Sequence, residues 1–366
     1  MLDPEITRRV LERAVAIQQI PAPTFHESQR AAYIQSCFEQ EGLLDVQQDS
    51  LGNVYGRLPG SGGGRPLIVS AHTDTVFPPS TDLAIQWSAE NIYGPGIGDN
   101  SLGVAGLFGL IWQARQANLP GDLWLVANVG EEGLGDLKGM RAVVDRFGAG
   151  VRAYLILEGM ALGQVYHRAL GVQRYRITAR TSGGHSWIDY GRPSAIHHLA
   201  GLVNSLASLN LPREPRTTLN VGVISGGTTV NTIASEAWLE LDLRSEGEQA
   251  LRNLVARVQT ITADAQRAGV LFESEQIGQR PAGSLSPRHP LVALAMRCLE
   301  EQGLKPTLTI GSTDANIPLS RGYPAVCIGL STGQGAHTLH ECINTAPLAA
   351  GLAQLSALVQ AVFSQL

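Results

Sequence analysis

Residues that can bind a metal ion lie at the ends of several apolar, strand-like runs, although these runs are far apart in the sequence. They are His72, Asp99 in a glycine-rich turn, the adjacent pair Glu131 and Glu132, Glu158 and His337. In an open α/β sheet the carboxyl ends of the parallel strands line one crevice, so side chains at those ends meet there. Two imidazoles and several carboxylates gathered in one crevice are the ligand set of a dinuclear, zinc-like site.

The composition is that of a globular protein without an affinity for nucleic acid. Of the 366 residues, 44% are hydrophobic and 16% are charged, and the formal net charge is −5. No run of Lys and Arg provides a basic patch. No apolar stretch approaches the roughly 20 residues needed to cross a bilayer, and the N-terminus lacks a signal-peptide pattern. The four cysteines show no C-x-x-C spacing, so we expect a reduced, cytoplasmic enzyme without a membrane partner.

Strands and helices alternate in the first half of the chain. Apolar runs over 67–71, 122–129 and 153–158 are separated by helical periodicity over 101–116 and 138–146. That alternation predicts an α/β fold in which a mostly parallel sheet is covered by helices on both faces.

The pattern changes near Val165. Residues 172–181 alternate between apolar and polar side chains, as in a strand with one solvated face, and further long strands and helices follow. We therefore expect an inserted α+β domain over 168–280. Residues 1–167 and 281–366 then form the larger domain, which carries the metal site.

Two segments at predicted strand ends suggest chemistry beyond metal binding. A metal-bound imidazole needs an acceptor on its other ring nitrogen, and Asp74, two residues after His72, can provide one. The adjacent carboxylates of Glu131 and Glu132 repel each other unless a cation or a proton resolves the conflict. We expect one of the pair to bind metal and the other to act as the general base.

Asp99 and Glu158 complete the predicted set of carboxylates. One carboxylate can bridge two metal ions that lie a few ångströms apart, and Asp99 suits this position. Glu158 ends an otherwise apolar strand, where a lone buried carboxylate would be costly. The loop after the last predicted strand offers both His337 and His340, and we expect one of them to bind metal.

A serine nucleophile is a competing interpretation. The segment Gly329–Gly333 fits the G-x-S-x-G pattern around Ser331 and follows a strand. A nucleophile elbow should lead directly into a helix, whereas here His337 follows almost at once. The glycines at 94–98 lack the spacing of a dinucleotide-binding loop.

The ordered motifs resemble the metallopeptidase family of glutamate carboxypeptidase, acetylornithine deacetylase, succinyl-diaminopimelate desuccinylase and tripeptidase T. The matching segments run nearly end to end: Ser70–Val76, Gly98–Asn100, Glu131–Gly133, Glu158 and Ala336–Glu341. The resemblance implies a zinc-exopeptidase-like catalytic domain with an inserted lid and dimerisation domain. It also implies a cis peptide bond between Asp99 and Asn100, which is costly for a non-proline residue.

The resemblance also implies a division of roles in the metal site. One ion is expected on His72 and Glu158, the other on Glu132 and His337, with Asp99 bridging them. Glu131 is then the general base, and Asp74 orients His72. The family's last histidine stands four residues before a glutamate, so Glu341 favours His337 over His340.

Three residues of the inserted domain match substrate-binding positions of the same family. His185 matches a lid histidine that polarises the scissile carbonyl, sometimes from the partner subunit. Asn231 and Arg244 match residues that hold the substrate carboxylate, and an arginine fork suits that task because it can bind a carboxylate through two hydrogen bonds. Asp314 lies in a recurrent segment of the family without an assigned role.

The expected function is hydrolysis of an amide or peptide bond in a small substrate that carries a free carboxylate. A di- or tripeptidase or a carboxypeptidase-like exopeptidase is expected first, and an N-acyl-amino-acid deacylase resembling acetylornithine deacetylase is the alternative. A non-catalytic binding protein is disfavoured by the intact Glu131 and both histidines. The oxygen and nitrogen ligands favour two zinc ions and admit cobalt or manganese. The resemblance further implies a homodimer formed through the lid domain.

Overall fold

The computed structural model describes residues 3–115, 117 and 119–366. The chain divides into two compact units. The larger unit contains the chain up to Ala169 together with Gly283–Leu366, and the inserted unit is Leu170–Ala282.

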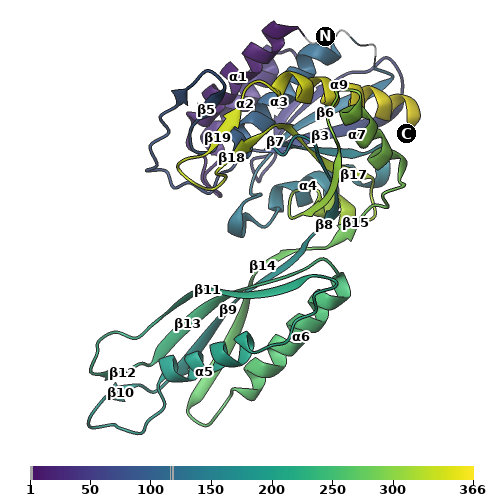
Figure 1. Cartoon of the computed structure of the whole chain (residues 1–366). Helices are drawn as coiled ribbons and strands as arrows, with labels where there is room; N and C mark the ends of the chain where they lie inside the picture. Colours follow the sequence, from purple (N-terminus) through teal and green to yellow (C-terminus); the bar gives the residue numbers. More distant parts are fainter. Residues whose placement is uncertain (1–2, 116, 118) are drawn as a thin grey trace. The chain divides into compact units, whose positions relative to one another are not determined.

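The larger unit is built on a mixed sheet of nine strands (Figure 1). In spatial order these are β1 (Leu44–Gln48), β2 (Val54–Leu58), β6 (Gly121–Asn128), β3 (Gly64–His72), β7 (Tyr154–Met160), β17 (Ala325–Ser331), β8 (Gln164–Ala169) and β15 (Gly283–Ser284), while β16 (Thr307–Gly311) pairs with β8. The four central strands β6, β3, β7 and β17 are parallel, whereas the pairs β1–β2, β2–β6, β17–β8 and β8–β15 are antiparallel. The expected α/β fold is confirmed, with parallel pairing concentrated at the centre of the sheet.

Helices cover both faces of this sheet. One face carries α1 (Pro4–Gln18), α2 (Ser28–Gln40), α3 (Gly103–Ala114), α7 (Pro290–Glu300) and α9 (Leu348–Gln365), and the other carries α4 (Lys138–Phe147) and α8 (Asn316–Ser320). Successive side chains of a strand point to opposite faces of its sheet. Accordingly Leu155 and Leu157 belong to the first core, under the larger group of helices. Tyr154 and Ile156 belong to the second core, under α4 and α8. Strands buried on both faces read as continuous apolar runs, which is why the sequence revealed them.

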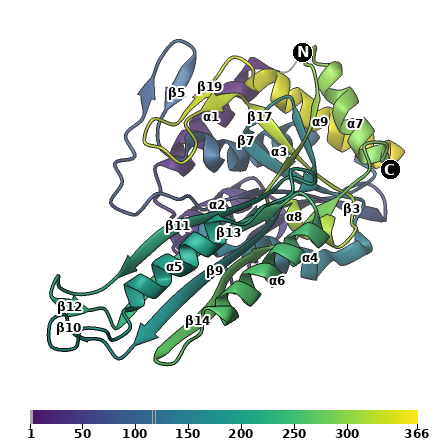
Figure 2. The ribbon, with the colours of Figure 1, turned by 60° about the horizontal axis from the view of Figure 1, so that its bottom comes forward.

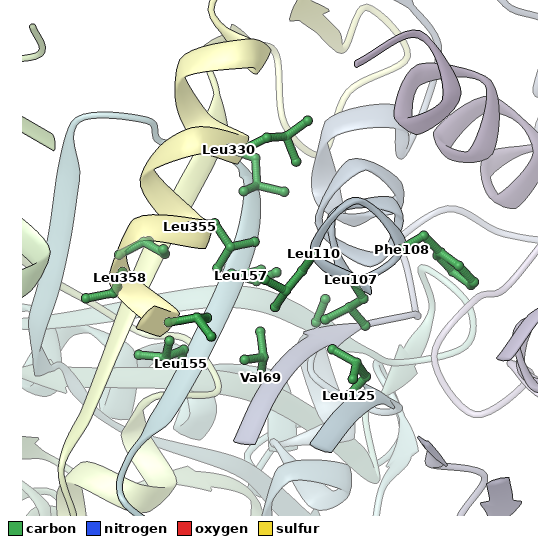
Figure 3. Close-up of a cluster of buried hydrophobic side chains, with 14 of the residues drawn as sticks. Val69, Leu107, Phe108, Leu110, Leu125, Leu155, Leu157, Leu330, Leu355 and Leu358 are labelled. Atoms are coloured by element: carbon green, nitrogen blue, oxygen red, sulfur yellow. The ribbon is translucent and has the colours of Figure 1, made fainter. Parts of the chain in front are cut away.

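The first core is the larger of the two. Figure 3 shows Leu155 and Leu157 of β7 beside side chains of α3 and α9, including Leu107 and Leu355. By length and apolar composition α9 could also cross a membrane, unlike the sequence expectation. This is weak evidence for a membrane helix, because half of its residues are buried inside the protein and its leucines fill this core.

Several local features were not visible in the sequence. The helix expected over 101–116 begins at Gly103, because the preceding turn over Ile97–Leu102 departs from helical backbone geometry at Asp99 and Asn100. The strands β8 and β16 were also missed, since β8 alternates in burial like a strand of the inserted unit.

The expected cis peptide bond between Asp99 and Asn100 is present.

A small antiparallel sheet lies beside the loops of the larger unit that carry the expected metal ligands Asp99 and His337. Its strands are β18 (Gly333–Gln334), β19 (Cys342–Asn344), β5 (Asn91–Tyr93) and β4 (Gln86–Trp87), in that spatial order. It joins the segment just before Asp99 to the segment just after Glu341.

The inserted unit is a four-stranded antiparallel sheet with two helices packed on it (Figure 2). The strand order is β11 (Thr217–Gly226), β13 (Glu236–Ser245), β9 (Gly171–Thr181) and β14 (Val270–Arg280), and the helices are α5 (Ala195–Ala207) and α6 (Glu248–Asp264). A two-stranded ribbon of β10 (Gly184–His185) and β12 (Thr232–Ile233) lies at one end of the unit. Alternate side chains of β13 are buried against the helices, as the alternating sequence requires.

Truncation of Leu355 tests whether α9 is a core helix. We expect Leu355→Ala to lower the free energy of unfolding by about 2–5 kcal/mol, because the side chain is fully buried and its removal leaves a cavity. The exposed Gln360 on the same helix provides the control, and Gln360→Ala should change stability by less than about 0.5 kcal/mol. Urea denaturation followed by circular dichroism measures both. Equal stability of the two variants would show that α9 does not pack as described.

Candidate metal centre

The carboxyl ends of the central parallel strands bring the predicted ligands together. His72 is the last residue of β3, Glu158 lies in β7, and Glu131 follows β6 by three residues. His337 lies beyond β17, in the loop between the short strands β18 and β19. Since β6, β3, β7 and β17 are neighbours in this order, residues from positions 72 to 337 meet at one edge of the sheet.

Asp99 lies between the two imidazoles. Its Oδ1 is 3.1 Å from Nε2 of His72, and its Oδ2 is 3.0 Å from Nε2 of His337. Nε2 of His72 also lies 3.7 Å from Oε2 of Glu158, and Nε2 of His337 lies 3.1 Å from Oε1 of Glu132. The carboxylate of Asp99 thus lies beside two sets of possible metal-binding atoms, one on His72 and Glu158 and the other on His337 and Glu132.

Three groups of possible ligands emerge among the described residues. They are His72 with Asp99 and Glu158, Asp99 with Glu132 and His337, and His72 with Glu131 and Glu132. In each group the donor atoms lie within 4.8 Å of one another. Glu132 therefore belongs to a group with His337, whereas Glu131 is grouped only with His72 and Glu132. This geometry favours Glu132 over Glu131 as the ligand on the His337 side.

The electrostatics of the cluster are those of a site built for cations. Burial raises the pKa of Glu158 to about 7, and the nearby charge of Asp99 adds to this effect against the opposing effect of His72. Hydrogen bonds with Asp99 and Glu132 raise the pKa of His337 to about 10. Burial lowers the pKa of His72, but its carboxylate neighbours outweigh this and hold the pKa well above the ordinary value. Without a metal ion, protons on the imidazoles compensate the carboxylates.

The donor set fits two divalent cations. Neutral imidazole nitrogens and carboxylate oxygens are the usual ligands of zinc, and two ligands of one tetrahedral ion at 2.0–2.2 Å lie about 3.4 Å apart. The separations of 3.0–3.7 Å between the imidazoles and the carboxylates match that spacing. The pair on His72 and the pair on His337 share Asp99, so the residues present suit a bridged pair of ions.

Asp74 fixes both His72 and the segment of the two glutamates. Nδ1 of His72 lies 3.2 Å from the main-chain carbonyl oxygen of Asp74 and 3.5 Å from its Oδ1. The carboxylate accepts hydrogen bonds from the main-chain N–H groups of Glu131 at 3.0 Å and Glu132 at 2.9 Å, and from the hydroxyl of Thr24 at 2.9 Å. Asp74 is therefore the acceptor behind His72 through both its main chain and its side chain, and it also holds the Glu131–Glu132 turn in place.

Sequence reasoning missed Asn100 as a residue that supports the site. Its amide donates to the carbonyl oxygen of Leu157 at 2.8 Å and accepts from the N–H of Gly159 at 2.9 Å. These two groups flank Glu158, so Asn100 fixes the main chain that carries this predicted ligand. The position next to Asp99 was the only available signal, because the partner strand is distant in sequence.

Two buried charged residues behind the site were missed as well. Arg30 donates to the carbonyl oxygens of Thr73 at 2.7 Å and Ile20 at 2.6 Å, and Glu27 accepts from the N–H of Gly130 at 3.1 Å. Burial lowers the pKa of Arg30 to about 10 against the opposing charge of Asp74. Both residues lie at the start of an ordinary amphipathic helix, where nothing in the sequence distinguishes them.

Other residues singled out in the sequence have plainer environments. Ser331 is fully buried and its hydroxyl donates to the carbonyl oxygen of Asn344, so it does not present the exposed nucleophile of a serine hydrolase. His340 is exposed and belongs to none of the three ligand groups among the described residues. Asp314 is fully buried and accepts a hydrogen bond from the amide of Asn128 at 2.7 Å. Its charge contributes to the raised pKa of Glu158.

Two of the three candidate residues of the inserted unit are neighbours. His185 in β10 pairs with Thr232, and the N–H of Ser186 donates to the carbonyl oxygen of Asn231 at 3.0 Å. Nδ1 of His185 accepts from the N–H groups of Trp187 at 3.2 Å and Ile188 at 3.4 Å. The neutral ring then carries its proton on Nε2, which makes this atom a hydrogen-bond donor.

Arg244 lies at the opposite end of the same sheet. From Glu236, next to the β10–β12 ribbon, to Arg244 the strand β13 runs for eight residue steps, or about 26 Å. The guanidinium donates to Oδ1 of Asp242 at 2.6 Å and Oδ2 at 3.2 Å. Within one chain, the structure therefore does not bring Arg244 to His185 and Asn231.

Comparison with known proteins gives a consistent picture. The profile of the family described as "Peptidase family M20/M25/M40" matches residues 68–361. An uncharacterised protein of Bacillus subtilis, YqjE, is 22% identical over 355 residues, which cover 91% of this chain and 93% of that protein. A tripeptidase of Staphylococcus aureus has a similar structure, with a TM-score of 0.83 and 22% identity over 98% of this chain and 99% of that one.

A third similar protein is described as a dinuclear metal-binding peptidase. This is the YxeP protein of Bacillus subtilis, with a TM-score of 0.72 and 16% identity, where the match covers all of both chains, 100% of each. At these identities the two structures show that the fold is shared.

Metal binding to this cluster should release protons. In the metal-free chain His337 has a pKa of about 10, so its ring is charged at pH 7.5, whereas a metal ligand must be neutral. Metal affinity should therefore increase as the pH rises from 6 to 9.

The stability that the charged ring confers on the metal-free chain is fully present below about pH 6.5 and is lost as the pH rises through 10.

Isothermal titration of the metal-free protein with Zn²⁺ at pH 7.5 measures this release. The apparent binding enthalpy should change with the ionisation enthalpy of the buffer. The slope of this dependence should correspond to the release of at least about one proton per chain. An enthalpy that is independent of the buffer would contradict the protonation state described for the metal-free cluster.

Proposed function

The chain belongs to peptidase family M20/M25/M40 and is a metallohydrolase, and we propose that its substrates are di- or tripeptides with a free carboxylate. The observation that supports this function is the position of Asp99 between His72 and His337, with Glu158 and Glu132 on either side. This arrangement is suited to two cations that act on one carbonyl group.

The residues that would hold the ions follow from the two outer ligand groups. His72 and Glu158 would hold one ion, Glu132 and His337 would hold the other, and Asp99 would serve both. When bound, the two ions polarise the scissile carbonyl and make water a stronger acid. Zinc is the metal proposed first, with cobalt or manganese as alternatives, because nitrogen and oxygen ligands accept all three.

Glu131 is proposed as the general base. It is adjacent to the ligand Glu132, is 6% exposed, and has its main chain fixed by Asp74. A carboxylate in this place can take the proton of the attacking water and return it to the leaving amine. The attacking water thus supplies both the hydroxyl group that joins the carbonyl carbon and the proton that the leaving amine takes up.

The inserted unit would supply the groups that recognise the substrate. Nε2 of His185 can donate a hydrogen bond to the carbonyl oxygen, where negative charge develops in the transition state. Asn231 and Arg244 are proposed to hold the substrate carboxylate. The guanidinium of Arg244 already binds Asp242, so the substrate carboxylate would have to compete with Asp242 for it. The side chain of Arg244 is 40% exposed, so a substrate can reach it.

A panel of substrates tests the proposed function. We expect the zinc- or cobalt-loaded protein to hydrolyse dipeptides or tripeptides faster than N-acetyl amino acids, and chelation followed by metal addition should abolish and restore the activity. Glu131→Gln should lower kcat by about 10²- to 10⁴-fold, because the general base is lost, and should keep the metal content. Faster hydrolysis of N-acetyl amino acids would identify a deacylase instead, and full turnover by Glu131→Gln would reject the proposed mechanism.

The separation within the inserted unit supports a homodimer. One substrate cannot contact Arg244 and His185 of the same unit across about 26 Å. Two copies that exchange their β10–β12 ribbons could each complete the other's site. The surface next to His185 and Asn231 is apolar, since Trp187 is 86% exposed and Tyr190 is 91% exposed, and such patches mark interaction sites. The four cysteines are free thiols, in keeping with the proposed cytoplasmic location.

Mixed dimers test this arrangement. His185→Ala and Arg244→Ala should each be nearly inactive alone. After the two variants are unfolded and refolded together, activity should return to about a quarter of the wild-type value, because half of the dimers are mixed and one of their two sites is complete. No recovery, in a sample that forms dimers by light scattering, would show that both residues act in their own chain, and an active single variant would show that the substituted residue is not required.

A further inference from the structure

The buried carboxylate of Glu341 fastens the loop that carries Asp99. Its Oε1 accepts hydrogen bonds from the main-chain N–H groups of Gly98 at 2.7 Å and Asp99 at 2.8 Å, and its Oε2 accepts one from Gly96 at 3.0 Å. The side chain is fully buried. A buried carboxylate is costly unless donors surround it, and here three N–H groups of one loop satisfy both oxygens.

The main chain at Glu341 strengthens the same connection. The N–H of Gly94 donates to the carbonyl oxygen of Glu341 at 2.9 Å. From the next residue onward β19 pairs with β5, with Cys342 opposite Tyr93. Four hydrogen bonds and a strand pair therefore join this residue to the segment that leads into Asp99.

Glu341 also closes the loop that carries His337. Its N–H donates to the carbonyl oxygen of Thr338 at 3.2 Å, and the N–H of Thr338 donates to Gly335 at 3.0 Å. His337 itself has a positive φ of 64°, which is uncommon for a residue other than glycine. The turn that presents His337 therefore ends at the residue that holds Asp99.

Glu341 acts on the site only through these loops. Among the described residues, the groups that could hold a metal ion do not include it. Its oxygens point to main-chain N–H groups, and the nearest ligand, Asp99, is held by its own N–H. Metal ligands need their positions fixed within about 0.2 Å, so a small shift between the two loops would be enough to weaken binding.

We propose that Glu341 is a positioning residue that sets the separation of Asp99 from His337 and thereby the metal affinity of the His337 side. The inference rests on the proposed metal-dependent function, but it concerns metal binding and not turnover. It can therefore fail separately, since metal affinity is measurable even if no peptide substrate is found.

The matched test compares Glu341→Gln with Asp49→Asn. The glutamine side chain would keep the shape of the glutamate, but its NH₂ group would face an N–H donor, which breaks one of the three hydrogen bonds. Asp49 accepts from the N–H groups of Leu51, Gly52 and Asn53 in a loop without a metal ligand, so it is a control for the loss of a loop-capping carboxylate. Thermal unfolding of the metal-free variants shows how far each one is destabilised.

Zinc affinity, measured by competition with a chromophoric chelator, gives the decisive comparison. We expect Glu341→Gln to weaken the binding of at least one ion by about 10- to 100-fold, and Asp49→Asn to leave both affinities within about twofold of the wild type. Excess zinc should restore most of kcat in Glu341→Gln, with KM unchanged. Unchanged zinc affinity in Glu341→Gln, or an equal loss in both variants, would overturn the proposal.

Hydrogen exchange in the wild type keeps the proposal testable if Glu341→Gln does not fold. The N–H groups of Gly96, Gly98 and Asp99 should exchange slowly in the metal-free protein, because Glu341 holds them without help from a metal. Rapid exchange of these groups without metal, with protection only after zinc is added, would show that the metal orders the loop and that Glu341 does not.

Discussion

The structure of the site depends on the confinement of Asp99 between two imidazoles. Five carboxylates, counting Asp74 and Glu131, meet only two histidines at this edge of the sheet. Such an excess of negative charge is stable only if protons or cations compensate it. In the metal-free chain the pKa values of Glu158 and His337 are both raised, so protons on these two side chains compensate the negative charge. Divalent cations would replace both protons in this compensation.

The proposed ligands are held by neighbours that belong to none of the three possible ligand groups among the described residues. Asp74 fixes the Glu131–Glu132 turn, Asn100 fixes the strand around Glu158, and Glu341 fixes the loop of Asp99. Asn100 and Glu341 bond to main-chain groups around the proposed ligands, whereas Asp74 bonds to main-chain N–H groups and also lies behind the ring of His72. These hydrogen bonds tie the loops that bear the proposed ligands to the neighbouring chain, which favours the spacing that two ions require.

The sequence predicted the fold class because its central strands are buried on both faces. Apolar runs such as 67–71 and 153–158 are visible without knowledge of their partners. It could not predict Arg30 or Asn100 as supporting residues, because their contacts join segments that are distant in the chain. The separation of Arg244 from His185 also required coordinates, since it depends on which end of β13 adjoins the ribbon. The candidate ligands could be named from sequence, but their spacing could not.

The most direct test of the central claim is an anomalous-diffraction map of crystals of the zinc-loaded protein. We expect two peaks per chain, one bound by His72 and Glu158 and the other by Glu132 and His337, with Asp99 between them and Glu131 outside both coordination shells. A single peak, or a zinc ion coordinated by Glu131 in place of Glu132, would contradict the claim.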